Sequence, residues 1–228
     1  QDHDMILRLT DRAEKVVHVP RLLYYWRSHS GSVASGIEAK PYAIDAAKRA
    51  VAWNLEKHGL EHFEIESTRA FETIFRIRYK ISGAPKVSAV IINAGKPEEL
   101  QRCKTFVTEV SSYKNYEIII GDSGLTAASY PKQMNLGARR AAGEYLLFLD
   151  SRSEILTADW MEELLMYAQR EDVGAVGAKL YNPDDTIFHA GLVLGLGAAR
   201  TAGCIFAGQH RRSLGYMGRL CYAQDISA

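Results

Sequence analysis

The sequence from Gly143 to Glu154 is GEYLLFLDSRSE, and this stretch decides the fold. An apolar run, Tyr145–Leu149, follows the glycine and stops at an acid, Asp150. Such a run is typical of a strand buried on both faces, as in a parallel sheet. In open α/β sheets, ligands bind beyond the carboxyl ends of the strands, where a carboxylate can hold a divalent cation that in turn holds a diphosphate. Asp also favours turns, so Asp150 taken alone fits a purely structural role at least as well.

The sequence around this stretch alternates between strand and helix patterns. Buried strands are predicted at 87–92, 116–120 and 145–149, further strands at 173–180 and 187–194, and helices at 97–110, 132–142 and from a cap at Thr157 to 167. The second of these helices is expected to be closed by Gly143. Strand–helix–strand units imply a parallel sheet with right-handed crossovers. The expected fold class is therefore α/β, with a central, mostly parallel sheet flanked by helices.

The first 85 residues follow a different pattern. Helices are predicted at 2–13 and 40–58, the second ended by Gly59, and an extended segment is predicted at 16–26. Apolar residues at every second position from 75 to 81 predict a half-exposed strand. Gly83-Ala84-Pro85 interrupts the pattern, and a domain boundary is expected there.

Composition excludes several classes of protein. The 228 residues include 28 Lys and Arg against 27 Asp and Glu, so a net charge of +1 argues against electrostatic capture of nucleic acid. No apolar stretch is long enough for a transmembrane helix. The three cysteines, Cys103, Cys204 and Cys221, lack the spacing of metal ligands and fit a reducing cytoplasm.

Two consecutive predicted strands end in acids, Asp122 and Asp150, and the first strand ends in Asn93-Ala94-Gly95. In a parallel sheet these ends lie along one edge and form a polar crevice. Two carboxylates suit a nucleotide, one at the base or ribose and the other facing the phosphates through a metal. The glycine-rich loops of the two commonest nucleotide folds are absent, which disfavours those folds.

Three blocks carry a family resemblance: VSAVII at 87–92, YEIIIGDSG at 116–124 and NLGARRAAGEYLLFLD at 135–150. Together they resemble the nucleotide-binding half of family 2 glycosyltransferases, in the family's order and spacing. The resemblance continues through 157–164 and 173–181. HAGLVLG at 189–195 resembles the branch that builds O-antigen or rhamnan-type polysaccharides of the bacterial cell envelope. The family resemblance as a whole implies a GT-A-like nucleotide-diphospho-sugar transferase fold over residues 87–228, incomplete at the C-terminus.

The N-terminal part resembles the other half of the same family. QDHDMILRL at 1–9 resembles the acidic base motif and its helix, and HVPRLLYYWRSH at 18–29 resembles the strand and loop that close over the donor diphosphate. The resemblance implies the end of one transferase domain at 1–60, a β-rich linker at 61–85 and the start of a second domain at 86–228. The two half-domains are expected to pair within one chain or between two.

The resemblance also implies an activity and its site residues. The chain is expected to be a fragment of a longer, tandem-domain parent protein. This parent is expected to be an inverting, hexosyltransferase-like enzyme of the cytoplasm, with the inner face of the membrane as a candidate location. Its expected partners are a nucleotide-diphosphate sugar donor and a glycan or lipid-linked glycan acceptor, with Mn²⁺ or Mg²⁺ as the family's cofactor. The implied residues are Asp2 as catalytic base, Asp150 as metal ligand, and Asn93, Asp122, Asn135, Asp150, Arg152, Arg27 and His29 around the donor.

One position departs from the family's Asp-x-Asp motif, because Arg152 stands where the second acid is expected. A guanidinium is a poor neighbour for a divalent cation. Either Arg152 replaces the metal and pairs directly with the diphosphate, or the domain is a degenerate, non-catalytic module that binds nucleotide or carbohydrate. A nucleotidyltransferase is a third reading, but the segment 93–97 only faintly resembles the basic glycine-rich loop that it requires.

Overall fold

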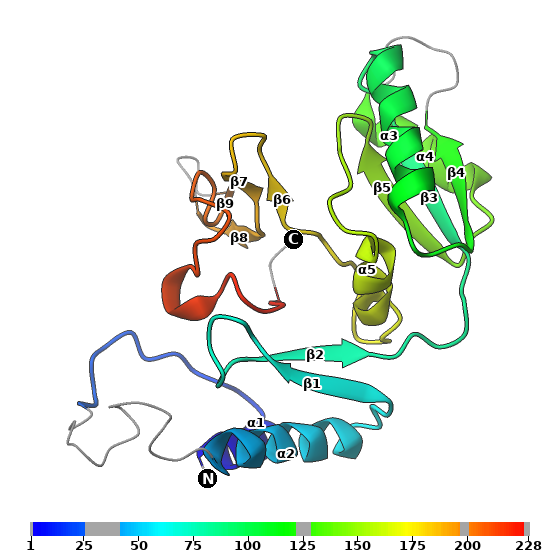
Figure 1. Cartoon of the computed structure of the whole chain (residues 1–228). Helices are drawn as coiled ribbons and strands as arrows, with labels where there is room; N and C mark the ends of the chain where they lie inside the picture. Colours follow the sequence, from blue (N-terminus) through cyan, green and yellow to red (C-terminus); the bar gives the residue numbers. More distant parts are fainter. Residues whose placement is uncertain (1, 26–41, 122–128, 197–200, 226–228) are drawn as a thin grey trace. The chain divides into compact units, whose positions relative to one another are not determined.

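A computed structural model of the chain describes residues 2–25, 42–121, 129–196 and 201–225 (Figure 1). The chain forms two compact units. One is Lys80–Ala178, and the other combines Gln1–Tyr79 with Lys179–Ala228. The division into transferase segments at residues 60 and 85 remains a prediction.

The unit Lys80–Ala178 is built on the parallel sheet that the sequence predicts. β3 (Val87–Ile92) lies at the centre and pairs in parallel with β4 (Tyr116–Ile120) and β5 (Tyr145–Asp150), in the order β4-β3-β5. All six residues of β3 are buried, because a central strand has a neighbour at each edge and helices over its faces.

Three helices accompany this sheet: α3 (Pro97–Val110), α4 (Tyr130–Arg140) and α5 (Trp160–Ala168). Since β4 and β5 flank β3 on opposite sides, right-handed crossovers place α3 and α4 on opposite faces. Figure 1 shows α3 in front of the sheet and α4 behind it. The helix limits predicted for α3 are confirmed, with Pro97 in its first turn and Cys103 and Val107 buried.

A glycine allows α4 to approach β3 closely. A Cβ atom built on Gly137 would lie 2.2 Å from Cγ1 of Val90, which is far inside van der Waals contact. Val90 packs with Ile92 and Ile119 in a core against which Met134 of α4 and Ala141, the residue that caps this helix, are packed. The spacing between α4 and the sheet therefore depends on the missing side chain at position 137.

The prediction that β5 is buried on both faces is wrong for one of them. Leu146 and Phe148 are 47% and 41% exposed. Phe148 pairs with Val90 and so faces the same side of the sheet as α4. This helix packs against β3 and β4, which leaves alternate side chains of β5 uncovered among the described residues.

Gly143 has a different role from the predicted helix cap. α4 ends at Arg140, and Gly143 lies against β3, where its backbone N–H donates to Ser88 Oγ at 2.8 Å. A Cβ there would lie 2.7 Å from that oxygen. Ser88 donates to Glu117 Oε1 at 2.6 Å, and this hydrogen bond is the largest cause that lowers the pKa of Glu117 to about 2.

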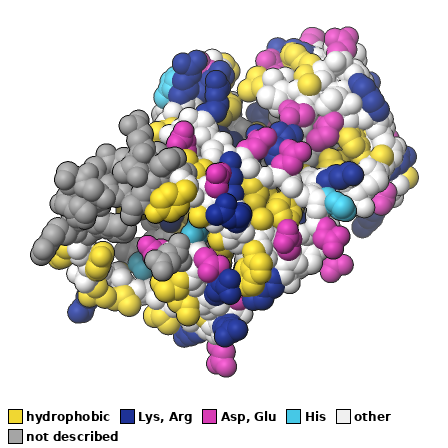
Figure 2. All heavy atoms as spheres, turned by 60° about the horizontal axis from the view of Figure 1, so that its bottom comes forward, with side chains coloured by type: hydrophobic (Ala, Val, Ile, Leu, Met, Phe, Trp, Pro, Cys, Tyr) yellow, Lys and Arg dark blue, Asp and Glu magenta, His cyan; other side chains and the backbone are white. Residues whose placement is uncertain are grey.

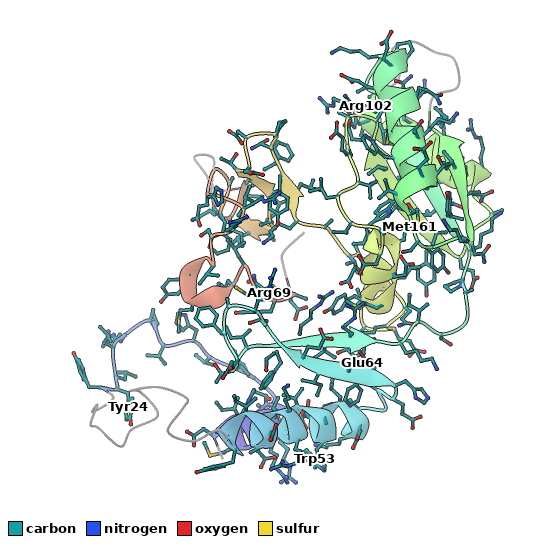
Figure 3. The ribbon with its side chains drawn as sticks, viewed as in Figure 1. Tyr24, Trp53, Glu64, Arg69, Arg102 and Met161 are labelled. Atoms are coloured by element: carbon teal, nitrogen blue, oxygen red, sulfur yellow. The ribbon has the colours of Figure 1, made fainter. Side chains whose placement is uncertain are left out.

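The other unit begins with a helix pair and a hairpin. α1 (Asp2–Thr10) packs against α2 (Tyr42–Lys57), which carries Trp53 (Figure 3). Arg8 lies over the ring of Trp53, 4.1 Å from its centroid. The predicted strand near 75–81 is β2 (Phe75–Tyr79), which pairs antiparallel with β1 (Phe63–Ser67). No strand was predicted at the position of β1. In the cross-strand pair Glu64–Arg78, side chains of unlike charge are neighbours on adjacent strands.

Two strands predicted after α5 differ in the structure. Of 173–180 only the end is strand, in β6 (Leu180–Tyr181), because a strand needs a paired neighbour and the described residues offer none to 173–179. The predicted strand 187–194 is split at Gly191, whose φ is +115°, into β7 (Ile187–His189) and β8 (Leu192–Leu194). β6 pairs with β7, and β8 pairs with β9 (Ala202–Cys204).

Two properties concern both units. Among the described residues, no helix combines the length and apolarity needed to cross a bilayer. Figure 2 shows basic and acidic side chains interspersed over the face in view, in keeping with the nearly balanced charges of the sequence.

Candidate functional site

The carboxyl ends of the parallel strands meet at one edge of the sheet, which confirms the prediction. Ile92 at the end of β3 pairs with Asp150 at the end of β5. Just beyond them, the backbone N–H of Ala94 donates to Ser151 Oγ at 3.0 Å, and Ser151 is buried. The loop after β3 is thus tied to the loop after β5, and Asp150 is held beside the Asn93 loop.

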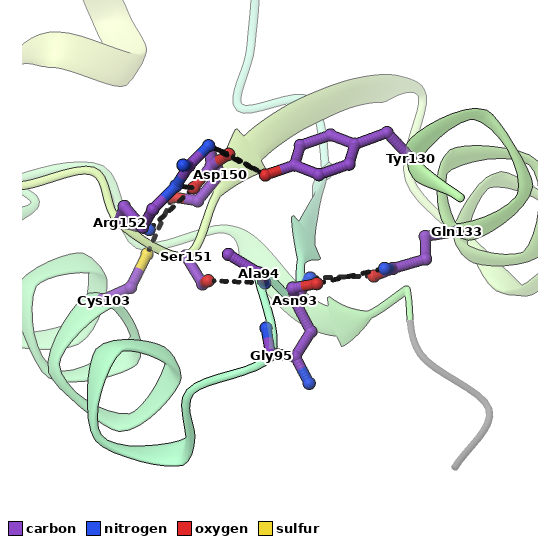
Figure 4. Close-up of polar contacts among 9 residues, drawn as sticks. All are labelled: Asn93, Ala94, Gly95, Cys103, Tyr130, Gln133, Asp150, Ser151 and Arg152. Carbon is purple, nitrogen blue, oxygen red and sulfur yellow. Dashed lines mark hydrogen bonds and ion pairs between the residues drawn. The ribbon is translucent and has the colours of Figure 1, made fainter. Parts of the chain in front are cut away.

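The carboxylate of Asp150 accepts four hydrogen bonds (Figure 4). Arg152 supplies three: its backbone N–H and Nε reach Oδ1 at 2.8 and 2.9 Å, and Nη2 reaches Oδ2 at 2.8 Å. The hydroxyl of Tyr130, the first residue of α4, donates to Oδ2 at 2.5 Å and accepts from Arg152 Nη2 at 2.9 Å. We call Asp150, Arg152 and Tyr130 the Asp150 cluster.

These contacts set the protonation states of the Asp150 cluster. The hydrogen bond from Arg152, with further help from Tyr130, lowers the pKa of Asp150 to about 2 against the opposing effect of burial. The hydrogen bond to Asp150 raises the pKa of Tyr130. At neutral pH the cluster therefore contains a carboxylate, a guanidinium and a protonated phenol.

A thiol from α3 lies close behind the cluster. Cys103 is buried, and its Sγ lies 3.8 Å from the backbone oxygen of Asp150. Burial is the main cause that raises the pKa of Cys103 to about 11. A protonated, buried thiol is inert, so Cys103 serves packing here rather than nucleophilic chemistry.

Gln133, which was not among the residues predicted from the sequence, holds the loop after β3. Its side-chain amide is buried and bridges the backbone of Asn93, accepting from the N–H at 2.8 Å and donating to the carbonyl at 3.0 Å. Asn135, chosen from the sequence, lies on the exposed side of α4. A usable signal was the i,i+4 spacing of Gln133 and Gly137, which marks the helix face toward the sheet.

The Asp150 cluster does not fit a divalent cation. All four acceptor positions of the Asp150 carboxylate are in use, and a positive guanidinium occupies the side from which a metal would bind. Within the described ranges, no group of three or more His, Cys, Asp or Glu side chains has the arrangement of a metal site. Ligation of Mn²⁺ or Mg²⁺ by Asp150, which the family resemblance implies, stays an untested prediction that these contacts disfavour.

The other predicted site residues are distributed as follows. Asn93 lies at the edge, and its Oδ1 accepts from Gly95 N–H at 2.9 Å. Asp2 is exposed at the start of α1, in the other unit. Asp122, Arg27 and His29 lie outside the described residues. The structure therefore brings together Asn93, Asp150 and Arg152 among the predicted donor-binding residues.

Comparison with known proteins gives two relatives. The chain is 30% identical over 263 aligned residues to an uncharacterized protein of Sinorhizobium fredii, y4gI, covering 100% of this chain and 28% of that protein. It is 31% identical over 219 residues to the O-antigen biosynthesis protein RfbC of Myxococcus xanthus, covering 86% of this chain. No family profile and no solved structure matches the chain. The chain spans 28% and 17% of the lengths of these two relatives.

Proposed function

We propose that this chain is part of a glycan-biosynthesis enzyme and that the carboxyl edge of its parallel sheet binds the nucleotide diphosphate of a sugar donor. The observation that carries the proposal is the 31% identity to the O-antigen biosynthesis protein RfbC over 86% of the chain. Building an O-antigen requires transfer of sugars, and an activated sugar is bonded to a phosphate that leaves when the sugar is transferred.

The geometry of the sheet edge supports a nucleotide as ligand. In open α/β sheets, ligands bind outside the carboxyl ends of strands where the chain reverses its direction of winding, and the order β4-β3-β5 places such a point beside β3. Asn93, Asp150 and Arg152 lie at this position. The same edge is closed on one side by Gln133 and Tyr130 from α4.

The reaction we propose for the parent protein is an inverting displacement. The acceptor hydroxyl attacks the anomeric carbon of the donor, the bond from that carbon to the diphosphate oxygen breaks, and a carboxylate base takes the hydroxyl proton. The leaving group is the nucleoside diphosphate. Asp2 is the candidate base, and its role is independent of the donor site around Asp150.

A second candidate function is a non-catalytic module that binds a nucleotide or a carbohydrate. The observation that favours it is the saturation of the Asp150 carboxylate by Arg152 and Tyr130, since a carboxylate with four hydrogen bonds is not available to a metal. Under this alternative the carboxyl edge of the sheet still binds a nucleotide or a carbohydrate, but no sugar is transferred.

Ligand-induced stabilisation tests the donor site directly. The 228-residue chain is heated with UDP, GDP or dTDP, and with the corresponding nucleotide sugars, each in Mn²⁺ and in EDTA. A ligand at one hundred times its dissociation constant adds about 2.7 kcal/mol to the free energy of unfolding, which is readily seen as a rise in Tm. Stabilisation by one nucleotide supports the proposal and names the base. No stabilisation by any of them contradicts it.

Transfer itself separates the enzyme from the module. In the full-length parent protein, release of the nucleoside diphosphate from the stabilising donor is followed in the presence of the glycan acceptor. The enzyme is expected to release it, and Asp2→Asn is expected to abolish the share of the release that the preceding transferase domain catalyses, while nucleotide binding at the Asp150 edge is kept. Binding without release in the native protein favours the module.

A further inference from the structure

Resting on the proposed function, we propose that Arg152 takes the place of the divalent cation, and that the Asp150 cluster is a metal-independent binding site for the diphosphate of the nucleotide donor. Arg152 contacts the ligand, whereas Asp150 and Tyr130 are positioning residues that hold its guanidinium.

Some of the N–H groups of Arg152 are bound within the Asp150 cluster, and the others remain for a ligand. A guanidinium has five N–H groups in one plane. Nε and both hydrogens of Nη2 are directed to Asp150 and to the hydroxyl of Tyr130. Nη1 has no partner among the residues that the structure describes, and the side chain is 61% exposed. The two N–H groups of Nη1 remain to donate to the oxygens of a phosphate, a group that guanidinium binds well.

The cluster also fixes the orientation of the guanidinium before a ligand arrives. Asp150 binds it through both carboxylate oxygens, and Tyr130 contacts the same Nη2 from α4. A long side chain that is already ordered loses less conformational entropy on binding than a mobile one. Affinity therefore depends on the planar fork as well as on the positive charge, because the Asp150–Arg152 pair is neutral as a whole.

The structure supplies a matched control on the same unit. Arg170 holds Asp172, two residues away, by the same fork: Nε to Oδ1 at 2.9 Å and Nη2 to Oδ2 at 2.6 Å. This pair lies after α5 rather than at the carboxyl edge of the sheet. Arg170→Ala removes an ion pair of the same fork geometry without touching the proposed site.

Binding of inorganic pyrophosphate and of UDP, GDP and dTDP to the 228-residue chain is measured by calorimetry in EDTA. We expect binding without metal that weakens as salt is raised. Arg152→Ala is expected to weaken it about tenfold or more, as for a lost hydrogen bond to a charged group, and Arg170→Ala is expected to leave it unchanged. Arg152→Lys keeps the charge without the fork and is expected to recover only part of the loss.

Tyr130→Phe separates positioning from folding. It is expected to weaken pyrophosphate binding a few-fold with no change in the urea midpoint. In the Arg152→Ala background the same change is expected to have no further effect, because the side chain that Tyr130 orients is absent. An equal effect of Tyr130→Phe in both backgrounds overturns its positioning role.

The remaining outcomes distinguish this inference from the proposed function. Nucleotide binding that requires Mn²⁺, or that survives Arg152→Ala, overturns the inference and leaves the donor site standing. Pyrophosphate binding that depends on Arg152, with no nucleotide bound, supports the anion site and contradicts the proposed function. If neither pyrophosphate nor any nucleotide binds, both are overturned, and Arg152 only stabilises the turn after β5.

Discussion

Replacing Gly137 by Ala tests the packing of α4 on the sheet, which positions both Gln133 and Tyr130. The new Cβ would lie 2.2 Å from Cγ1 of Val90 and 3.2 Å from its Cγ2, whereas carbon atoms pack best at about 3.5–4.0 Å. Val90 is fully buried in the central strand, with β4 and β5 paired on either side of it. Neither Val90 nor β3 can move away, so α4 has to shift by more than about 1 Å to restore contact distance.

The expected cost follows from two opposing effects. Overpacking a core costs about 1–3 kcal/mol, and this contact belongs at the upper end. Ala in place of Gly in a helix returns up to about 1 kcal/mol. We therefore expect Gly137→Ala to lower the free energy of unfolding by about 2 kcal/mol, which moves the urea midpoint down by about 1 M.

Urea denaturation is followed through the fluorescence of Trp160, which lies in the same unit, in a chain whose Trp26 and Trp53 are replaced by Phe. Arg139→Ala, on the exposed side of the same helix, is the control and is expected to change stability by only a few tenths of a kcal/mol.

A double-mutant cycle provides the refutation. Val90→Ala removes the atoms that the new Cβ would strike, so the double variant Val90→Ala/Gly137→Ala is expected to be more stable than the sum of the single changes by at least about 1 kcal/mol. A Gly137→Ala chain with an unchanged or raised midpoint, or additive changes in the cycle, would refute the close approach of α4 to β3.

Three further predictions concern the site. Gln133→Leu leaves the two backbone groups that it bridges without partners and is expected to cost about 1–3 kcal/mol in the same urea assay; an unchanged midpoint contradicts the bridge. Hydrogen bonds from Arg152 lower the pKa of Asp150 to about 2, so the stability that Asp150 contributes is present above its ordinary pKa of 3.8 and is lost as the pH falls toward 2. Asp150→Asn is expected to remove this part of the acid dependence of stability. A pH profile of stability that the substitution leaves unaltered argues against this role of Asp150. At pH 8 iodoacetamide is expected to alkylate the exposed Cys204 long before the buried Cys103, and equal rates measured by mass spectrometry contradict the raised pKa of Cys103.

Local pattern was sufficient for the framework of the unit that carries the candidate site. Apolar runs of five or six residues at 87–92, 116–120 and 145–149, with helical periodicity between them, predicted the strands, the parallel pairing and the edge at which Asn93 and Asp150 meet. These features follow from the sequence because strand and helix periods, and the reach of a short crossover, are properties of adjacent residues. Pro97 at the start of α3 was predicted for the same reason.

Pattern was less informative where an element depends on a partner far along the chain. β1 was missed although its Glu side chains alternate against the Arg side chains of β2, and 173–179 was predicted as a strand although no neighbour pairs with it among the described residues. Exposure of Leu146 and Phe148 likewise depends on which strands α4 covers. In each case the deciding contact joins segments that are distant in the sequence, and the periodicity of neighbouring residues does not reveal which distant segments come together.

The sequence by itself determined that an acid and an arginine lie at the carboxyl end of the third strand of a parallel sheet, and therefore at which edge we propose that a ligand binds. Only the tertiary structure decided what these two residues do to each other: Arg152 turns back on Asp150, and Tyr130, twenty residues earlier, closes the pair from α4. The physical reason is that a side chain's partner is chosen by the packing of distant elements, here the approach of α4 to β3 at Gly137, whereas the order of strands and helices is set residue by residue along the chain.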